Sequence, residues 1–153
     1  MKILLKIIIS LILFINTSYA ELIKPNSNLR PLDVLTIQLN SLKNNNIPYK
    51  DAGIEQTWEF AHPVNKAATG PLKRFKKMIY GNSYNILISH ENSNSIILTE
   101  SPNKFVYKVY VLAKDKKKYY YIWQIEKVEL EGEFKNCWMT TAVSDPIYLG
   151  ETI

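Results

Sequence analysis

The sequence predicts an α+β fold, in which three helices pack on one face of a curved antiparallel sheet. Apolar residues recur at every third or fourth position in three segments between Pro31 and Gly81, which is the spacing of amphipathic helices. From Tyr84 to Val143 they recur at every second position, as in strands with one buried face. Helices gathered at the start of a chain and antiparallel strands at its end are typical of α+β domains.

The three helices are expected at residues 31–44, 51–62 and 71–81. Prolines at the first position of two of them favour a helix start, and Asp51 is the expected N-cap of the other. The last helix is expected to end at Gly81 in the left-handed conformation. The side chains expected to face the core are Leu32, Leu35, Leu39, Leu42, Ile54, Trp58, Ala61, Leu72, Phe75 and Ile79.

Five strands are expected, at residues 84–90, 95–100, 104–113, 118–130 and 134–143. The third and fourth carry the clearest alternation of apolar and polar residues, which predicts that each buries one face. The inward residues on these two strands are Phe105, Tyr107, Val109, Val111, Ala113, Tyr119, Tyr121, Trp123 and Ile125.

The first twenty residues have the pattern of an export signal. Lys2 and Lys6 surround the start of an apolar run centred on 7–15, and the small residues Ser18 and Ala20 follow it. The run is too short for a membrane span, which needs about 20 apolar residues. We therefore expect cleavage after Ala20, no stable membrane anchor after cleavage, and a periplasmic or secreted protein.

The remaining residues, 21–153, are long enough to form one domain, with a core at about 29–143. Without the two signal lysines the chain has 17 Lys and Arg against 14 Asp and Glu, a net charge of +3. Acidic residues are mixed among the basic ones between Glu91 and Glu133, so there is no stripe of one sign and no nucleic-acid partner is expected.

Cysteine and histidine are scarce in this chain. Cys137 is the only cysteine, which excludes an intrachain disulfide; we expect a buried thiol on a strand, and pairing between chains is the alternative. His62 and His90 are the only histidines, and their spacing builds no zinc site. No metal and no cofactor is therefore expected.

The segment His-Pro-Val-Asn-Lys-Ala-Ala-Thr-Gly-Pro, residues 62–71, is expected to connect the second and third helices. Pro63 cannot continue a helix, and Pro71 suits the first position of the next one. Gly70 is expected to be needed there for a positive φ or for close packing. Beyond this structural role, Lys66 and His62 make the start of the third helix a candidate anion site.

Several motifs resemble one known family. The stretch EFAHPVNKAATGPLKRFKKMIYGNSYNILI, followed by IWQIEK and CWMTTAV, is similar to the family catalogued as domain of unknown function 4864, within the nuclear-transport-factor-2-like superfamily. The resemblance spans about Leu29 to Val143, and His62 stands where the family pattern has serine. The strongest matches are Phe60, Pro63, Asn65, Thr69, Gly70, Pro71, Phe75, Met78, Tyr84, Trp123, Cys137, Trp138 and Met139.

This resemblance implies a cone-shaped domain and no particular activity, because the superfamily contains isomerases and dehydratases as well as binding and dimerisation domains. We expect a binding or interaction module whose partner is a small ligand or anion, or a second copy of the chain. The candidate ligand-binding residues are His62, Asn65, Lys66, Thr69, Gly70, Tyr107, Tyr121 and Trp123. The candidate dimer interface is the outer sheet face, with Val106, Tyr110, Leu112, Tyr120, Ile122 and Trp138.

The alternative is an isomerase-like or dehydratase-like enzyme with a buried acid or base. The candidate groups are Asp33, His62, His90, Gln124 and Glu126, each of which also suits a purely structural position. The basic run around Phe75 is another alternative, a membrane-surface site, although such runs are usually solvated helix faces.

Overall fold

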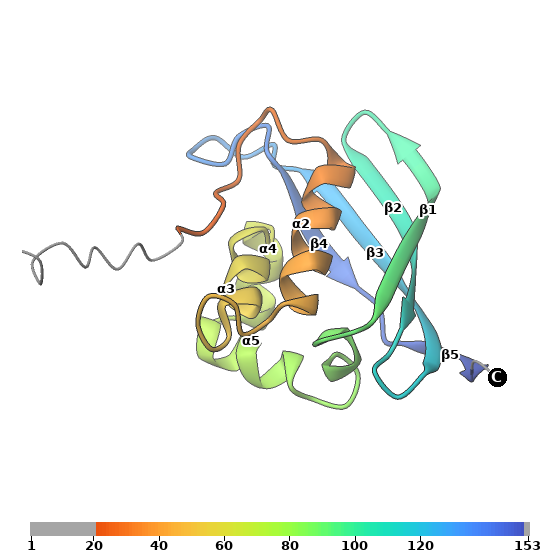
Figure 1. Ribbon diagram of the computed structural model, residues 1–153. Coiled ribbons are helices and arrows are strands. Elements are labelled where there is room, and N and C mark those ends of the chain that lie inside the picture. Colours follow the sequence, from red (N-terminus) through yellow and green to blue (C-terminus); the bar gives the residue numbers. More distant parts are fainter. Residues whose placement is uncertain (1–20, 152–153) are drawn as a thin grey trace, which may run out of the picture.

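The computed structural model describes residues 21–151, and the expected signal segment lies outside them. The fold is α+β, with the helices on one face of a five-stranded antiparallel sheet (Figure 1). The helices are α2 (Pro31–Lys43), α3 (Ala52–Glu59), α4 (Pro63–Thr69) and α5 (Leu72–Ile79), followed by the 3-10 helix η1 (Asn85–Leu87). The strands are β1 (Asn92–Ser101), β2 (Lys104–Leu112), β3 (Lys117–Lys127), β4 (Trp138–Val143) and β5 (Ile147–Glu151).

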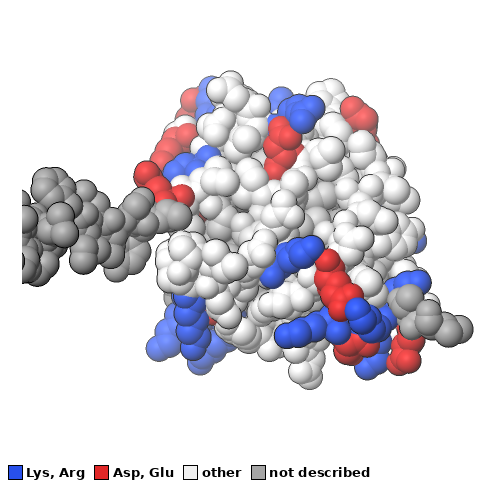
Figure 2. Space-filling model, viewed as in Figure 1, with Lys and Arg blue, Asp and Glu red and all other residues white. Residues whose placement is uncertain are grey.

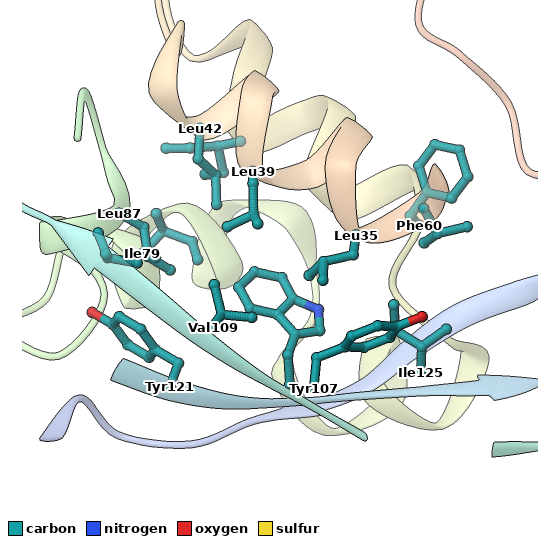
Figure 3. Packing of buried hydrophobic residues seen from close by; sticks show 14 of the residues in the cluster. Leu35, Leu39, Leu42, Phe60, Ile79, Leu87, Tyr107, Val109, Tyr121 and Ile125 are labelled. Carbon is teal, nitrogen blue, oxygen red and sulfur yellow. The ribbon is translucent and has the colours of Figure 1, made fainter. Parts of the chain in front are cut away.

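The strands follow the order β1-β2-β3-β4, and β5 pairs with the start of β3. On β2 and β3 the predicted inward alternation is confirmed, since Tyr107, Val109, Tyr121, Trp123 and Ile125 are buried. Figure 3 shows how side chains of α2 descend onto these strand residues. Each large apolar side chain buried in this way contributes about 1.5–3 kcal/mol to folding.

Helix α2 buries most of the face that was predicted, with one exception. Leu35, Leu39 and Leu42 lie in the core as expected, but Leu32 is 47% exposed. Gln38 is buried in its place, only 1% exposed. The buried stripe of α2 therefore contains a polar side chain that needs hydrogen-bond partners.

Residues 62–71 are not the plain connection that was predicted, because they contain helix α4. The preceding helix already ends at Glu59, and Pro63 occupies the first turn of α4 instead of stopping α3. His62 is the N-cap, and its Nδ1 accepts a hydrogen bond from the backbone N–H of Val64 at 3.2 Å. Residues 21–151 therefore contain four α-helices before the sheet rather than three.

The predicted strand at 84–90 is wrong, because this segment forms η1 and its flanking turns. The N–H of Leu87 bonds the carbonyl of Tyr84, and that of Ile88 bonds the carbonyl of Asn85, each at 3.0 Å. Leu87 is buried beneath the helices. Short apolar runs fit a buried turn as well as a strand, which explains the error.

Of two predicted caps, one is confirmed in position and one is wrong. Asp51 is the N-cap of α3 as predicted, although it lies in the left-handed region, with φ of 67°, and its side chain makes no capping bond. Gly81 does not terminate α5 with a positive φ, because Tyr80 is the C-cap in the right-handed region.

Two strand predictions also need correction. Strand β1 begins at Asn92 rather than at residue 95, and β4 begins only at Trp138. Residues 134–137 form a turn, so Cys137 precedes β4; it is buried as expected. Trp138 packs edge-on against Phe105, with ring centroids 5.3 Å apart, beside the main core. It is therefore not an outer-face residue.

A cluster of polar side chains ties the start of α3 to the end of α5. Lys76 Nζ lies 2.7 Å from Glu55 and 3.6 Å from Asp51, whose carboxylate also accepts the Tyr80 hydroxyl bond. The bond from Tyr80 lowers the pKa of Asp51, and the bond from Lys76 lowers the pKa of Glu55. Both carboxylates are therefore held in their charged forms.

We expect this cluster to make stability depend on pH in the acid range. Because the folded pKa values of Asp51 and Glu55 are lowered, their contribution is complete above the unfolded values of about 4 and is lost as pH falls through the lowered folded values. Melting temperatures measured from pH 7 to pH 3 should fall less steeply in Lys76→Met than in wild type. Parallel curves for the two proteins would contradict this.

Candidate functional site

A cavity of about 240 Å³ lies between the helices and the β3–β4 side of the sheet. Its apolar wall comes from α2, α5, η1 and the segment before α4, through Leu42, Ala61, Phe75, Met78, Ile79 and Leu87. Its polar groups come from Gln38, Thr57, Asn65, Thr69, Tyr84, Thr140 and Thr141. A mostly apolar wall with a few polar groups is the usual composition of a small-molecule site.

The floor of the cavity is a buried hydrogen-bond chain. The indole Nε1–H of Trp123 donates to Thr140 Oγ1 at 3.0 Å, and the Thr140 hydroxyl donates to Gln38 Oε1 at 2.6 Å. Gln38 Nε2 then donates to the carbonyl of Thr57 at 3.1 Å. The chain joins α2, α3 and two strands, so it fixes the helices against the sheet.

An irregularity in β4 brings Thr140 into this position. Ile125 pairs with Thr140, whereas the preceding Gln124 pairs with Ala142, so Thr141 is an extra residue on β4. The extra residue places Thr140 on the inner face together with Trp123. Thr141 instead accepts a hydrogen bond from the Gln124 side chain at 3.0 Å.

Helix α4 supplies the polar groups at the side of the cavity. Asn65 Nδ2 donates to the carbonyl of Thr140 at 3.1 Å, and the Thr69 hydroxyl donates to the carbonyl of Asn65 at 2.8 Å. Across from them, the Tyr84 hydroxyl donates to the carbonyl of Val143 at 3.0 Å, and burial raises the pKa of Tyr84. Tyr84 therefore stays neutral at physiological pH.

The cavity unites only three of the eight predicted ligand-binding residues, namely Asn65, Thr69 and Trp123. Tyr107 and Tyr121 belong to the core. The Tyr121 hydroxyl donates to the carbonyl of Ser83 at 2.8 Å, and burial raises the pKa of both tyrosines, that of Tyr107 to about 12.

Lys66 lies on the other side of α4, between two aromatic rings. Its Nζ is 5.6 Å from the ring centroid of Trp58 and 5.4 Å from that of Phe134, and it donates to the carbonyl of Glu59 at 3.3 Å. Burial lowers the pKa of Lys66. This lysine connects the loop after β3 to α3 through cation–π contacts.

Gly70 is placed by close packing rather than by a positive φ. Its φ is −74°, and a Cβ there would lie 2.5 Å from the Lys66 carbonyl oxygen and 2.9 Å from the Trp58 ring. We expect Gly70→Val to lower the free energy of unfolding by about 1–3 kcal/mol, because the ring and the helix end must separate. Urea denaturation measures this, and an unchanged midpoint would contradict it.

Two of the candidate acid or base residues meet outside the cavity. His62 and Glu126 line a separate groove of about 400 Å³ together with Val64, Lys104 and Leu130. Burial lowers the pKa of His62, and the charge of Glu126 opposes that shift. Glu126 also forms an ion pair with Lys104 at 3.4 Å.

Gln124 donates to Glu126 Oε1 at 2.9 Å, whereas Asp33 and His90 lie apart from both sites. Asp33 forms an ion pair with Arg30 at 2.9 Å, beside the start of α2. The bond from Arg30 lowers the pKa of Asp33 to about 2. His90 is buried, and its Nδ1 lies 2.8 Å from the carbonyl of Leu87.

The sequence reasoning missed Gln38, Thr57 and Thr140, which form the polar part of the cavity. Gln38 carried a signal, since it occupies a position between Leu35 and Leu42 on an otherwise apolar helix stripe. A polar residue there must bond inside the core or face a cavity. Thr140 carried none, because its inward orientation depends on the irregularity in β4.

No family model, curated protein or solved structure matched the chain. The resemblance to the nuclear-transport-factor-2-like superfamily and the cone shape therefore stay predictions. Among residues 21–151, no three His, Cys, Asp or Glu side chains gather as a metal site. Over the same residues, none of the helices has the length and apolar character needed to cross a bilayer.

Proposed function

We propose that the protein is a binding module that holds one small, neutral and mostly apolar molecule between its helices and its sheet. The observation that carries this proposal is the cavity of about 240 Å³, whose lining has no charged residue. A void of about 150 Å³ already accommodates benzene. The cavity therefore has room for one ring and a few further heavy atoms.

The lining supports binding over acid–base catalysis in this cavity. An isomerase or dehydratase needs a general acid or base within hydrogen-bond reach of the reacting atoms. Tyr84 is the only titratable residue along the cavity wall, and burial raises its pKa. The alternative enzyme function would have to use the separate groove of His62 and Glu126.

Toluene is a suitable probe for this proposal, with binding followed by the NMR signal of the Trp123 indole N–H. We expect toluene to shift that signal and to raise the melting temperature. Ala61→Leu should abolish both effects, because Ala61 is buried and lines the cavity. Ala68→Leu is the matched control, since Ala68 is exposed on α4 and lies outside the lining.

The proposal would be overturned if the Trp123 indole N–H signal of the wild-type protein did not shift near saturation with toluene. Should Ala61→Leu fail to fold, nuclear Overhauser contacts from toluene to the methyl groups of Leu87 and Ile79 locate the probe in its place. Contacts to exposed residues alone would count against the cavity.

A second role, pairing of two copies through the outer sheet face, is favoured by an aromatic patch there. Tyr110 and Tyr120 are directly opposite on β2 and β3, with ring centroids 6.3 Å apart, and both are only partly buried. Ile96 and Ile147 beside them are 50% and 48% exposed. Half-exposed apolar groups of this kind mark contact surfaces.

Figure 2, which has the same view as Figure 1, shows acidic and basic residues intermixed on this face of the molecule. On the outer sheet face, the charged centre of the patch is Lys108, with its Nζ 4.1 Å from the Tyr120 ring centroid and 5.2 Å from that of Tyr110. Because the ammonium lies over these rings, it covers part of their faces, so a second copy would have to pack around this charge.

We expect Tyr120→Glu combined with Ile122→Glu to convert a dimer into a folded monomer, because two carboxylates on each copy would meet across the interface. Light scattering at tens of micromolar measures the mass. Thr36→Glu with Asn82→Glu adds the same charge at exposed positions and should leave the dimer intact. A monomeric wild-type protein would contradict the pairing.

We also propose that the protein is exported and acts in the periplasm or outside the cell. Support comes from the signal pattern of residues 1–20 in the sequence. Mass spectrometry of the mature protein should give Glu21 as the first residue; an intact first segment on membrane-bound protein would contradict this.

A further inference from the structure

We infer that the ligand of the cavity carries a hydroxyl or N–H donor beside its apolar part, and that carboxylates and phosphates are excluded. This inference rests on the proposed binding function and specifies the chemical class of the ligand. It follows from a count of which hydrogen-bonding groups in the lining are already used.

The direction of the buried hydrogen-bond chain is fixed by Trp123, because an indole N–H can only donate. Thr140 Oγ1 accepts that bond, so its own proton goes to Gln38 Oε1, 2.6 Å away. The amide oxygen of Gln38 is thus an acceptor in the chain, and its nitrogen donates to the carbonyl of Thr57. Within this hydrogen-bond chain, no hydroxyl or indole proton remains to bind a ligand.

The other hydroxyl protons of the lining are used in the same way. Thr57 donates to the carbonyl of Gly53 at 2.8 Å, and Thr141 donates to the carbonyl of Gln124 at 3.3 Å. Thr69 donates to Asn65, and Tyr84 donates to Val143, again at backbone carbonyl oxygens. Each of these hydroxyls therefore has only its oxygen lone pairs left to offer a ligand.

Among the described residues, the remaining side-chain donors of the lining are one N–H of Gln38 and one of Asn65. Each amide nitrogen has two hydrogens, and one is used, on the carbonyl of Thr57 and on that of Thr140 respectively. The hydroxyl oxygens of Thr57, Thr69 and Tyr84 all remain acceptors. Acceptors thus exceed donors, and a ligand that donates a hydrogen bond matches them best.

Charge gives an independent restriction on the ligand. None of the cavity-lining residues is Lys, Arg, His, Asp or Glu. An anion that entered would lose its hydration without gaining a cation, and two amide N–H groups do not replace that hydration. The ligand class is therefore a neutral alcohol, phenol or amide with a small apolar body.

Toluene, phenol and benzoate form a suitable panel, since they share a ring and differ in polarity. In a purely apolar cavity phenol binds about tenfold or more weaker than toluene, because its hydroxyl loses water without a partner. Here we expect phenol to bind at least as tightly as toluene, and benzoate not to bind. The Kd values come from titrations of the Trp123 indole N–H signal.

Two variants test whether the acceptor oxygens matter. Thr57→Val and Tyr84→Phe each remove one hydroxyl oxygen whose lone pairs are available to a ligand. Both changes nearly keep the shape of the side chain. We expect at least one of them to raise the ratio of the phenol Kd to the toluene Kd several-fold. If the ratio of the two Kd values is unchanged in both variants, the inference is overturned.

The panel separates this inference from the proposed function. If toluene binds and phenol binds about tenfold or more weakly than toluene, the cavity binds ligands but does not select a hydrogen-bond donor. Tight binding of benzoate would overturn the exclusion of anions. Binding of none of the three probes would count against the binding function itself.

Discussion

Gly53→Ala should lower the free energy of unfolding by about 3 kcal/mol or more, the largest effect we expect from a single methyl group. A Cβ at Gly53 would lie 2.0 Å from the backbone oxygen of Ser41 and 2.8 Å from the Cα of Asn45. Both neighbours are backbone atoms near the end of α2, so no side-chain rotation can relieve the overlap. The first turn of α3 would have to move away from α2.

The same contact is held by hydrogen bonds that the movement would break. The N–H of Gly53 donates to the carbonyl of Asn45 at 2.9 Å, and the N–H of Ile54 donates to Asn45 Oδ1 at 3.0 Å. Urea denaturation of Gly53→Ala measures the loss. Gly81→Ala is the control, since a Cβ there approaches only the Met78 carbonyl oxygen, at 3.0 Å, and should cost far less. Equal losses in both variants would contradict this explanation.

The inner sheet face could be predicted from sequence because the period of two on β2 and β3 is unbroken. Every second residue from Tyr107 to Val111 and from Tyr121 to Ile125 is buried. The helices were harder, since α3 already ends at Glu59 and Pro63 begins α4 after a link of only three residues. A proline that begins a helix gives the same local pattern as a simple helix stop.

The remaining errors arise where tertiary pairing overrides local pattern. Strand β5 was missed because its apolar residues, including Ile147 and Leu149, are about half exposed, so they carry no burial alternation. Trp138 was placed on the wrong face because the extra residue in β4 changes which side chains point inward. The same irregularity hid Thr140, so the polar half of the cavity could not be assembled from spacing alone.

Thr140→Val should lower the free energy of unfolding by about 3 kcal/mol, because it leaves two buried partners unpaired. The Trp123 indole N–H would lose its acceptor and Gln38 Oε1 would lose its donor, while the side-chain volume stays almost the same. Thr141→Val is the matched control, since Thr141 is half-buried and bonds Gln124 rather than a member of the buried hydrogen-bond chain. We expect it to cost less than about 1 kcal/mol.

A double-mutant cycle with Gln38→Met tests whether the loss comes from the unpaired groups. In the Gln38→Met background there is no amide oxygen for Thr140→Val to leave unpaired. The losses of unfolding free energy in the two single variants should therefore sum to about 1 kcal/mol or more above the loss in the double variant. Additive losses, measured by urea denaturation, would mean that the two groups act independently. In that case the polar floor of the cavity would not act as one connected chain that fixes the helices against the sheet.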